Sequence, residues 1–165
     1  SAAPTTKRER AFLKWLRENG AKFDSIEWPS CKTPSGTRGA IARTDIGPGD
    51  HMVEIPRRLM ISEHHAKQDP EFGHVHRGNQ SILKSDNGLA LYVMEEMLKG
   101  ERSFYWPYLS ILPEPHNLGH WEESSLFELQ DAKLMRRSAA RRRHLRALHL
   151  HTFAVLDLSY PGLFP

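Results

Sequence analysis

The sequence predicts a mixed α+β fold in which helical segments flank a short β-rich stretch. Apolar residues recur at helical spacing near the amino terminus and again over 126–158, whereas turn residues interrupt short β-prone runs over 23–61. The chain has 165 residues, enough for one domain with a hydrophobic core. Hydrophobic residues make up 39% and charged residues 26%, which is typical of a globular chain rather than a disordered one.

The first expected element is a helix over 7–19. Phe12, Trp15 and Leu16 lie at positions i, i+3 and i+4, so they share one face of such a helix. Gly20 follows immediately and is a typical residue for the end of a helix. The pattern therefore predicts an amphipathic helix that packs on the rest of the chain.

Two short strands are expected next, over 40–43 and 52–55. Both runs contain β-branched residues and are bounded by turn-forming residues. The sequence Gly-Pro-Gly-Asp over 47–50 separates them and favours a tight reversal of the chain. We therefore expect a strand, a turn and a second strand in this region.

The segment after the strands is expected to alternate between helices and loops. Ser62 is suited to cap a short helix that ends near residue 67, and the polar segment 70–80 is expected to be a loop. A longer helix is expected over 82–99, with Gly100 as its stop.

The carboxy-terminal part is expected to contain an irregular segment and one long helix. The aromatic segment 103–115 is rich in proline and is expected to be irregular but packed in the core, in preference to forming a stacking surface for bases. The long helix is expected over 126–158. Its apolar stripe consists of Leu145, Leu148, Thr152, Val155 and Leu156.

A glycine-containing turn over 35–39, Ser-Gly-Thr-Arg-Gly, is the most informative local motif. It is no phosphate-binding P-loop, because no Gly-Lys-Ser/Thr follows, and no dinucleotide-binding fingerprint, because a strand follows it instead of a helix. Two interpretations stay open. The backbone comes close to a ligand or to another segment, where a Cβ would clash, or the turn is an ordinary hairpin turn.

No metal site and no catalytic residue is predicted from these patterns. His64, His65, His74 and His76 lie within thirteen positions, but zinc needs about four converging ligands and no cysteine is near. We therefore expect them to be solvated loop histidines. The chain contains neither Gly-x-Ser-x-Gly nor His-Glu-x-x-His, and Cys31 is its single cysteine.

A basic run from Lys133 to Arg146 contains seven basic residues and no acidic one, although the formal net charge of the chain is only +3. Arg136–Arg146 could bind the phosphates of a nucleic acid. The same residues could instead be the solvated face of the long helix, opposite Leu145 and Leu148, and this second interpretation is favoured.

Taken in order, several segments resemble the SET-domain protein methyltransferases of the Rubisco large-subunit methyltransferase-like class. Segment 12–21 resembles the helix that precedes the SET domain. Segment 36–46 resembles the first SET motif, whose usual form is Gly-x-Gly-hydrophobic-x-Ala-x-x-Asp-Ile. Segment 49–61 matches the next strands, and the run from 89 through 113 resembles the start of the insert that splits the SET domain in this class.

This resemblance implies a SET-like, β-rich fold that a helical insert interrupts, here in truncated form. Residues 1–22 would be the amino-terminal helix, 23–80 the first part of the SET domain, and 81–165 the start of the insert. The second half of such proteins carries an Asn-His pair and a tyrosine beside the methyl-transfer channel. The present sequence contains no Asn-His dipeptide. The resemblance thus implies that this chain alone holds no catalytic residue and is inactive.

The implied activity is transfer of a methyl group from S-adenosylmethionine to a protein lysine, with histidine as the alternative acceptor. In the family the first motif contacts the cofactor through backbone atoms. That role carries over to Gly36, Thr37, Arg38 and Gly39. Weak or absent cofactor binding is expected from this chain, because a partial pocket cannot enclose the ligand.

A second function stays open, that of a catalytically inactive SET-derived subunit with a structural or interaction role in a larger assembly. The expected partners are a protein substrate or partner protein chains. No apolar run reaches the roughly 20 residues that a membrane helix needs, and Cys31 alone gives no indication of secretion. We therefore expect a soluble intracellular protein, for which the plastid stroma, the nucleus and the cytosol are equally compatible.

Overall fold

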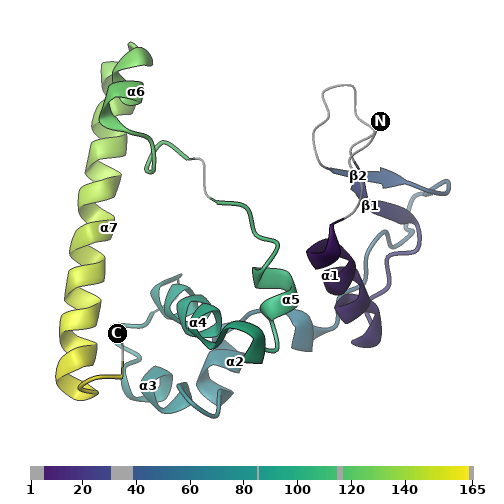
Figure 1. The fold of residues 1–165 in the computed structure, drawn as a ribbon, viewed down its shortest axis with the longest axis horizontal. Coiled ribbons are helices and arrows are strands. Elements are labelled where there is room, and N and C mark those ends of the chain that lie inside the picture. Colours follow the sequence, from purple (N-terminus) through teal and green to yellow (C-terminus); the bar gives the residue numbers. More distant parts are fainter. Residues whose placement is uncertain (1–5, 31–38, 85, 115–116, 164–165) are drawn as a thin grey trace. The chain divides into compact units, whose positions relative to one another are not determined.

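The computed structural model describes residues 6–30, 39–84, 86–114 and 117–163, which form helices and a small sheet (Figure 1). The chain divides into two compact units, Ser1–Leu112 and Pro113–Pro165. Helices with one two-stranded sheet agree with the predicted α+β class. No helix in the described segments is long and apolar enough to cross a membrane.

Helix α1 (Lys7–Glu18) forms as predicted, and residues next to it in the sequence determine where it begins and ends. At its start the Thr6 hydroxyl accepts a hydrogen bond from the Glu9 backbone N–H at 3.2 Å, and the Glu9 carboxylate accepts one from the Thr6 N–H at 2.7 Å. Gly20 follows the helix with a φ of +85°, which glycine adopts without strain.

The sheet pairs β1 (Ile26–Ser30) with β2 (Gly39–Ala42) in antiparallel register, with Ile26 opposite Ala42. The strand predicted near 40–43 is therefore confirmed, but the predicted strand 52–55 is wrong. The turn at 47–50 does form, because the Asp50 N–H donates to the Gly47 carbonyl at 3.1 Å. After this turn, Glu54 lies beside Lys22. The backbone N–H of each residue donates to the carbonyl of the other, which forms an isolated antiparallel bridge.

The next two helices are α2 (Glu63–Gln68) and α3 (Gly73–Gly78), preceded by the 3₁₀ turn η1 (Arg57–Leu59). Ser62 caps α2 as predicted, since its hydroxyl accepts from the His65 N–H at 3.3 Å. The prediction of a loop over 70–80 is wrong. The Asp69 carboxylate accepts from the N–H groups of Glu71 and Phe72, both at 2.9 Å, which turns the chain into α3.

Helix α4 (Asp86–Lys99) is followed by the 3₁₀ turn η2 (Gly100–Arg102) and by α5 (Trp106–Leu109). Helix α4 begins four residues later than expected, because 79–83 form turns of their own. Two clusters of buried side chains make the core around these elements. They are Ala66, Tyr92, Tyr105 and Leu109 in one cluster, and Ala21, Phe23 and Leu59 in the other. Trp15 of α1 packs against both clusters.

The aromatic segment was predicted to pack in the core, and two of its large side chains do so. Tyr105 and Leu109 are each 4% exposed. Phe104, which follows η2, is 46% exposed, although its ring contacts the rings of Trp15 and Tyr105 at 5.3 and 5.2 Å between centroids. The irregular segment thus contains a short helix that anchors it.

The second unit contains α6 (Glu123–Glu128) and α7 (Ala132–Ser159). The single long helix predicted over 126–158 is therefore broken, at residues 129–131. Gln130 adopts a φ of +51° there, and the Asp131 carboxylate accepts from the N–H groups of Lys133 and Leu134 at 2.9 and 3.0 Å. This side chain caps a new helix, which apolar periodicity alone does not reveal.

Gly88→Ala is expected to lower the free energy of unfolding by about 1–3 kcal/mol, the usual cost of overpacking. Gly88 is buried in the first turn of α4, and a Cβ there would meet the Leu83 carbonyl oxygen at 2.6 Å. Gly39→Ala is the matched control, because a Cβ at that position meets nothing within 4 Å. Urea unfolding followed by circular dichroism measures both variants, and equal midpoints for the two would contradict the expectation.

Candidate functional site

Of the four predicted cofactor residues, the structure describes one. Gly36, Thr37 and Arg38 lie outside the described residues, and Gly39 is the first residue of β2. A Cβ built on Gly39 would meet no atom of the described chain within 4 Å. Close packing within the described chain therefore gives no reason for a glycine at this position.

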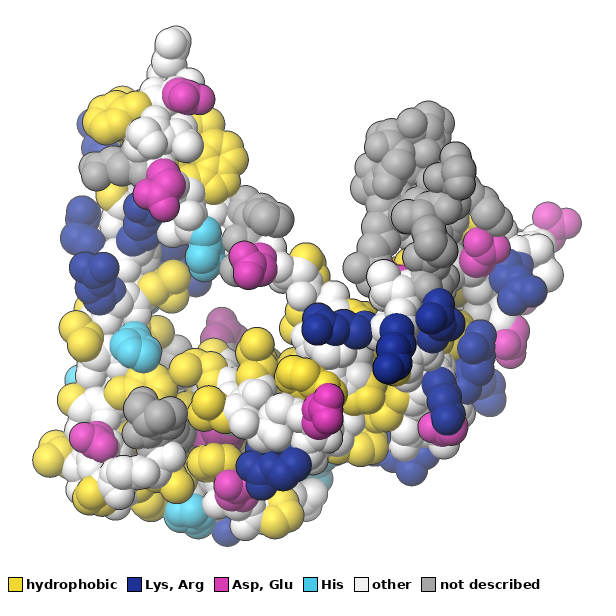
Figure 2. Space-filling view, in the orientation of Figure 1, with side chains coloured by type: hydrophobic (Ala, Val, Ile, Leu, Met, Phe, Trp, Pro, Cys, Tyr) yellow, Lys and Arg dark blue, Asp and Glu magenta, His cyan; other side chains and the backbone are white. Residues whose placement is uncertain are grey.

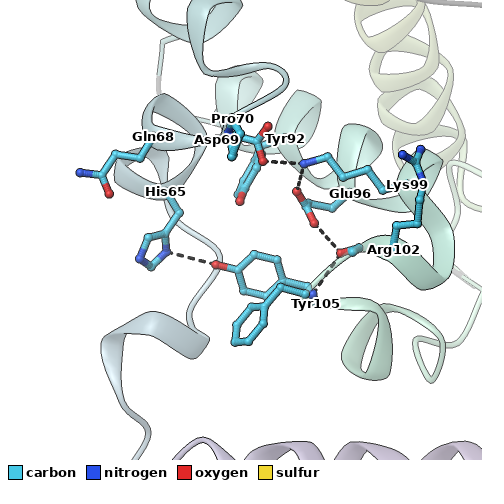
Figure 3. A pocket seen from close by; sticks show the side chains of 11 residues that line it. His65, Gln68, Asp69, Pro70, Tyr92, Glu96, Lys99, Arg102 and Tyr105 are labelled. Atoms are coloured by element: carbon cyan, nitrogen blue, oxygen red, sulfur yellow. Dashed lines mark hydrogen bonds and ion pairs between the residues drawn. The ribbon is translucent and has the colours of Figure 1, made fainter.

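A polar pocket lies elsewhere in the first unit, where α2, α4 and the turn before α5 meet (Figure 3). Its volume is about 280 Å³. It is lined by His65, Gln68, Asp69, Pro70, Tyr92, Glu96, Lys99, Arg102, Ser103, Phe104 and Tyr105. None of these residues was predicted as a site residue from the sequence.

An ion-pair cluster occupies one wall of this pocket, with Lys99 between two carboxylates (Figure 3). The Lys99 Nζ lies 2.5 Å from Asp69 Oδ2 and 2.6 Å from Glu96 Oε1. The side chains of Lys99, Asp69 and Glu96 are only 12%, 6% and 3% exposed. Because the three groups are largely withdrawn from water, each charge depends on the others for its stabilisation.

Proton affinities in the cluster follow from this geometry. Burial alone would raise the pKa of Asp69, but hydrogen bonds from Lys99 and from the backbone N–H groups of Phe72 and Glu71 outweigh it and hold that pKa below its ordinary value. Burial likewise acts to lower the pKa of Lys99, and the hydrogen bonds to Asp69 and Glu96 more than reverse this. Lys99 is therefore a fixed cation at neutral pH and cannot serve as a nucleophile.

The cluster also fixes the turn that carries Tyr105. The Ser103 hydroxyl donates to the second oxygen of Glu96 and accepts from the Tyr105 N–H at 3.0 Å. The Tyr105 hydroxyl lies 3.2 Å from His65 Nδ1, and this nitrogen is 2.8 Å from the Met60 carbonyl oxygen. Burial raises the pKa of Tyr105, so this ring stays a neutral phenol. The pocket can therefore orient hydrogen-bonding groups through Ser103, Tyr105 and His65.

A second buried pair joins α3 to α4. His76 Nε2 lies 2.8 Å from Glu95 Oε2, with the two side chains 2% and 0% exposed. The expectation that His76 is a solvated loop residue is therefore wrong, because α3 forms and carries it inside. Burial raises the pKa of Glu95, and the hydrogen bond with His76 partly offsets this rise. Across the described residues, no three His, Cys, Asp or Glu side chains converge as a metal site.

The buried carboxylates had a detectable sequence signature. Leu91, Tyr92, Glu95 and Glu96 occupy the same buried face of α4 at helical spacing. A glutamate pair at the core positions of an amphipathic helix indicates buried partners, because an isolated buried carboxylate is too costly. Glu96 finds its partners nearby in the sequence, in Lys99 and Ser103, whereas the partner of Glu95, His76, lies 19 residues away and depends on the tertiary structure.

Comparison with known proteins connects the chain to protein methyltransferases. The chain is 30% identical, over 82% of its length, to the [fructose-bisphosphate aldolase]-lysine N-methyltransferase, chloroplastic, of Arabidopsis thaliana. It is 28% identical, over 94% of its length, to the ribulose-1,5 bisphosphate carboxylase/oxygenase large subunit N-methyltransferase, chloroplastic, of Pisum sativum. It is 30% identical, over 73% of its length, to the Protein SET DOMAIN GROUP 40 of Arabidopsis thaliana. No protein-family model matches the chain.

These matches cover most of the chain but a minor part of each relative. The aligned regions are 27%, 31% and 28% of the three relatives in the same order. The resemblance drawn from the ordered motifs is thereby confirmed at the level of the class. The chain is related, over about this share of their length, to the SET-domain protein methyltransferases of the Rubisco large-subunit methyltransferase-like class.

Proposed function

We propose that the chain forms one portion of an S-adenosylmethionine-dependent methyltransferase that acts on a protein lysine, with histidine as the alternative acceptor. The observation that carries this proposal is the similarity, over 82% of the chain, to a protein whose name specifies lysine N-methylation. Two of the relatives are named as chloroplastic, which supports the plastid among the compartments that are compatible with the sequence.

In this proposal the backbone over 36–39 holds the cofactor, which supplies the methyl group. Gly39 supports this role, because packing within the described residues does not explain a glycine there, whereas close approach of the backbone to a ligand would. Methyl transfer of this kind depends on holding the acceptor nitrogen in line with the methyl group and on excluding water. The cluster around Lys99 would contribute by holding α4 and the turn before α5 in place.

The proposal predicts weak but localised binding of S-adenosylmethionine by the 165-residue chain. The expected dissociation constant is about millimolar, roughly −4 kcal/mol, because a partial pocket encloses only part of the ligand. Titration followed by amide chemical shifts should perturb Gly39 and Ala40 while leaving α7 unchanged. Gly39→Trp should abolish these shifts, since the proposal places the cofactor against Gly39 and a large ring at this position would displace it.

Ala40→Trp is the matched control for this titration. Ala40 neighbours Gly39 but is exposed at the alternate position of β2, so its side chain points to the other face of the strand. Retained shifts in Ala40→Trp and lost shifts in Gly39→Trp support the proposal. Shifts that are confined to other segments, or that survive in Gly39→Trp, would show that the cofactor does not bind at this motif.

The same chain is expected to transfer no radiolabelled methyl group to a protein acceptor, because the aligned region corresponds to only 27% and 31% of the length of the two relatives named for these methyltransferase activities. Incorporation above background that disappears in Gly39→Trp would instead show that these residues suffice for catalysis. Cofactor binding without methyl transfer would support the proposal that the chain is one portion of a methyltransferase. The absence of both cofactor shifts and methyl transfer would favour the inactive structural subunit.

A further inference from the structure

A groove in the second unit combines an apolar floor with basic side chains. It lies between segment 117–121 and the first half of α7, and its volume is about 900 Å³. Leu118, Trp121 and Leu134 contribute to its apolar surface. Figure 2 shows Lys and Arg side chains gathered along the same half of α7.

Side chains of α7 hold segment 117–121 against the helix through hydrogen bonds to three backbone carbonyls. Arg142 donates from Nε to the Gly119 carbonyl at 2.9 Å and from Nη2 to the Trp121 carbonyl. The Ser138 hydroxyl donates to the Leu118 carbonyl at 2.8 Å. Arg142 is therefore a structural residue of the unit, which corrects the interpretation of the whole basic run as a solvated face.

The arginines that line the groove form no ion pair with any described residue. Arg137, Arg141 and His144 follow one another at spacings of four and three residues, so they form one stripe about 10 Å long on α7. All three are exposed, and neither Arg137 nor Arg141 forms an ion pair with any described residue. The stripe thus presents unneutralised positive charge beside an apolar surface.

We propose that this groove binds an acidic peptide segment that carries apolar residues between its carboxylates. Charge complementarity selects the carboxylates, and arginine can hold a carboxylate through two parallel hydrogen bonds. The apolar floor selects for a segment with leucine-like side chains, which enter such grooves at helical spacing. The proposal does not depend on methyl transfer.

Nucleic acid is disfavoured by the arrangement of the arginines around α7. Arg136, Arg143 and Arg146 lie on a second stripe, roughly 100° or more around the helix from Arg137 and Arg141 at 100° per residue. The charge is therefore divided between two faces. A track for a phosphate backbone would concentrate it along one face and add stacking surfaces.

The test is fluorescence anisotropy with a labelled peptide of about four helical turns that carries leucine at positions i, i+3, i+4 and i+7 and glutamate at the others. The double variant Arg137→Ser/Arg141→Ser should bind at least about tenfold more weakly, because the charged hydrogen bonds to the carboxylates of the peptide are lost. Arg136→Ser/Arg143→Ser removes the same charge from the other stripe and should change the affinity by less than about twofold if only long-range attraction is lost. Circular dichroism verifies that both variants keep their helices.

Two further probes separate the charge of the groove from its apolar floor. A peptide with serine in place of every leucine should bind more weakly, and one with lysine in place of every glutamate should not bind. Equal losses in both double variants would overturn the proposal, as would the absence of peptide binding. Stronger binding of a single-stranded or duplex oligonucleotide that Arg137→Ser/Arg141→Ser abolishes would assign the groove to nucleic acid instead.

Discussion

Lys99→Met is expected to lower the free energy of unfolding of the first unit by about 3–5 kcal/mol at neutral pH, the usual effect of removing one partner from a buried ion pair. The substitution keeps most of the side-chain volume but leaves Asp69 and Glu96 without their cation. Their side chains are only 6% and 3% exposed, so water cannot replace it. Since a domain is stable by only about 5–15 kcal/mol, the loss should be visible as a large shift of the unfolding midpoint.

Urea unfolding followed by tryptophan fluorescence measures this effect, because Trp15 packs against the same core cluster as Tyr92 and Tyr105. Lys14→Met is the matched control. Lys14 pairs with Glu18 on the surface, where the side chains are 73% and 61% exposed, and its loss should cost at most about 0.5 kcal/mol. Similar midpoints for the two variants would mean that the buried cluster contributes nothing beyond an ordinary surface pair.

The pH dependence gives an independent check on the cluster. The pKa of Asp69 is held below its ordinary value of 3.8, so in the wild-type protein its contribution is fully present above that pH and is lost as pH falls through the lowered pKa. In Lys99→Met the cation that lowers this pKa is gone. The variant should therefore lose less stability than the wild type on acidification, and a parallel pH profile would contradict the assignment.

His76→Leu is the second substitution with a large expected effect, again about 3–5 kcal/mol at neutral pH. It leaves the Glu95 carboxylate, which is 0% exposed, without its hydrogen-bonding partner. The other carboxylate oxygen, Oε1, already has no hydrogen-bond partner among the described residues. His64→Leu is the control, because His64 lies on the exposed side of α2 and its loss removes no buried contact.

The double variant His76→Leu/Glu95→Leu distinguishes loss of the pair from loss of one partner. Replacing a buried pair by apolar residues is often neutral, so the double variant should be more stable than His76→Leu alone. Burial raises the pKa of Glu95 above its ordinary value of 4.5, so this group favours the folded state below pH 4.5 and disfavours it as pH rises through the raised pKa. His76→Leu should therefore regain part of its stability in acid.

Local sequence patterns were sufficient for the elements whose stabilising contacts are close in sequence. Helix α1 has its capping box, its apolar face and its glycine stop within fifteen residues, and it forms where it was expected. The cap at Ser62 and the turn at 47–50 are equally local, since each is closed by hydrogen bonds that span three residues. The ordered motifs likewise indicate the methyltransferase class, because the order of segments along a chain is a property of the sequence, and the similarity to known proteins confirms that class.

The remaining features required the tertiary structure, because their partners are distant or because one side chain overrides a periodic pattern. Asp131 caps a new helix inside an apolar repeat that predicted one continuous helix. Glu54 forms its backbone hydrogen bonds with Lys22 alone, as an isolated bridge, where the sequence predicted a strand. The Lys99 cluster and the His76–Glu95 pair join residues 30 and 19 positions apart, for which composition and spacing carry no information. By itself the sequence determined the class of protein and those elements whose stabilising contacts are local, such as α1 and the cap of α2. Which distant groups pair with the buried charges was decided only by the packing of α2, α3 and α4, because those partners come from separate elements.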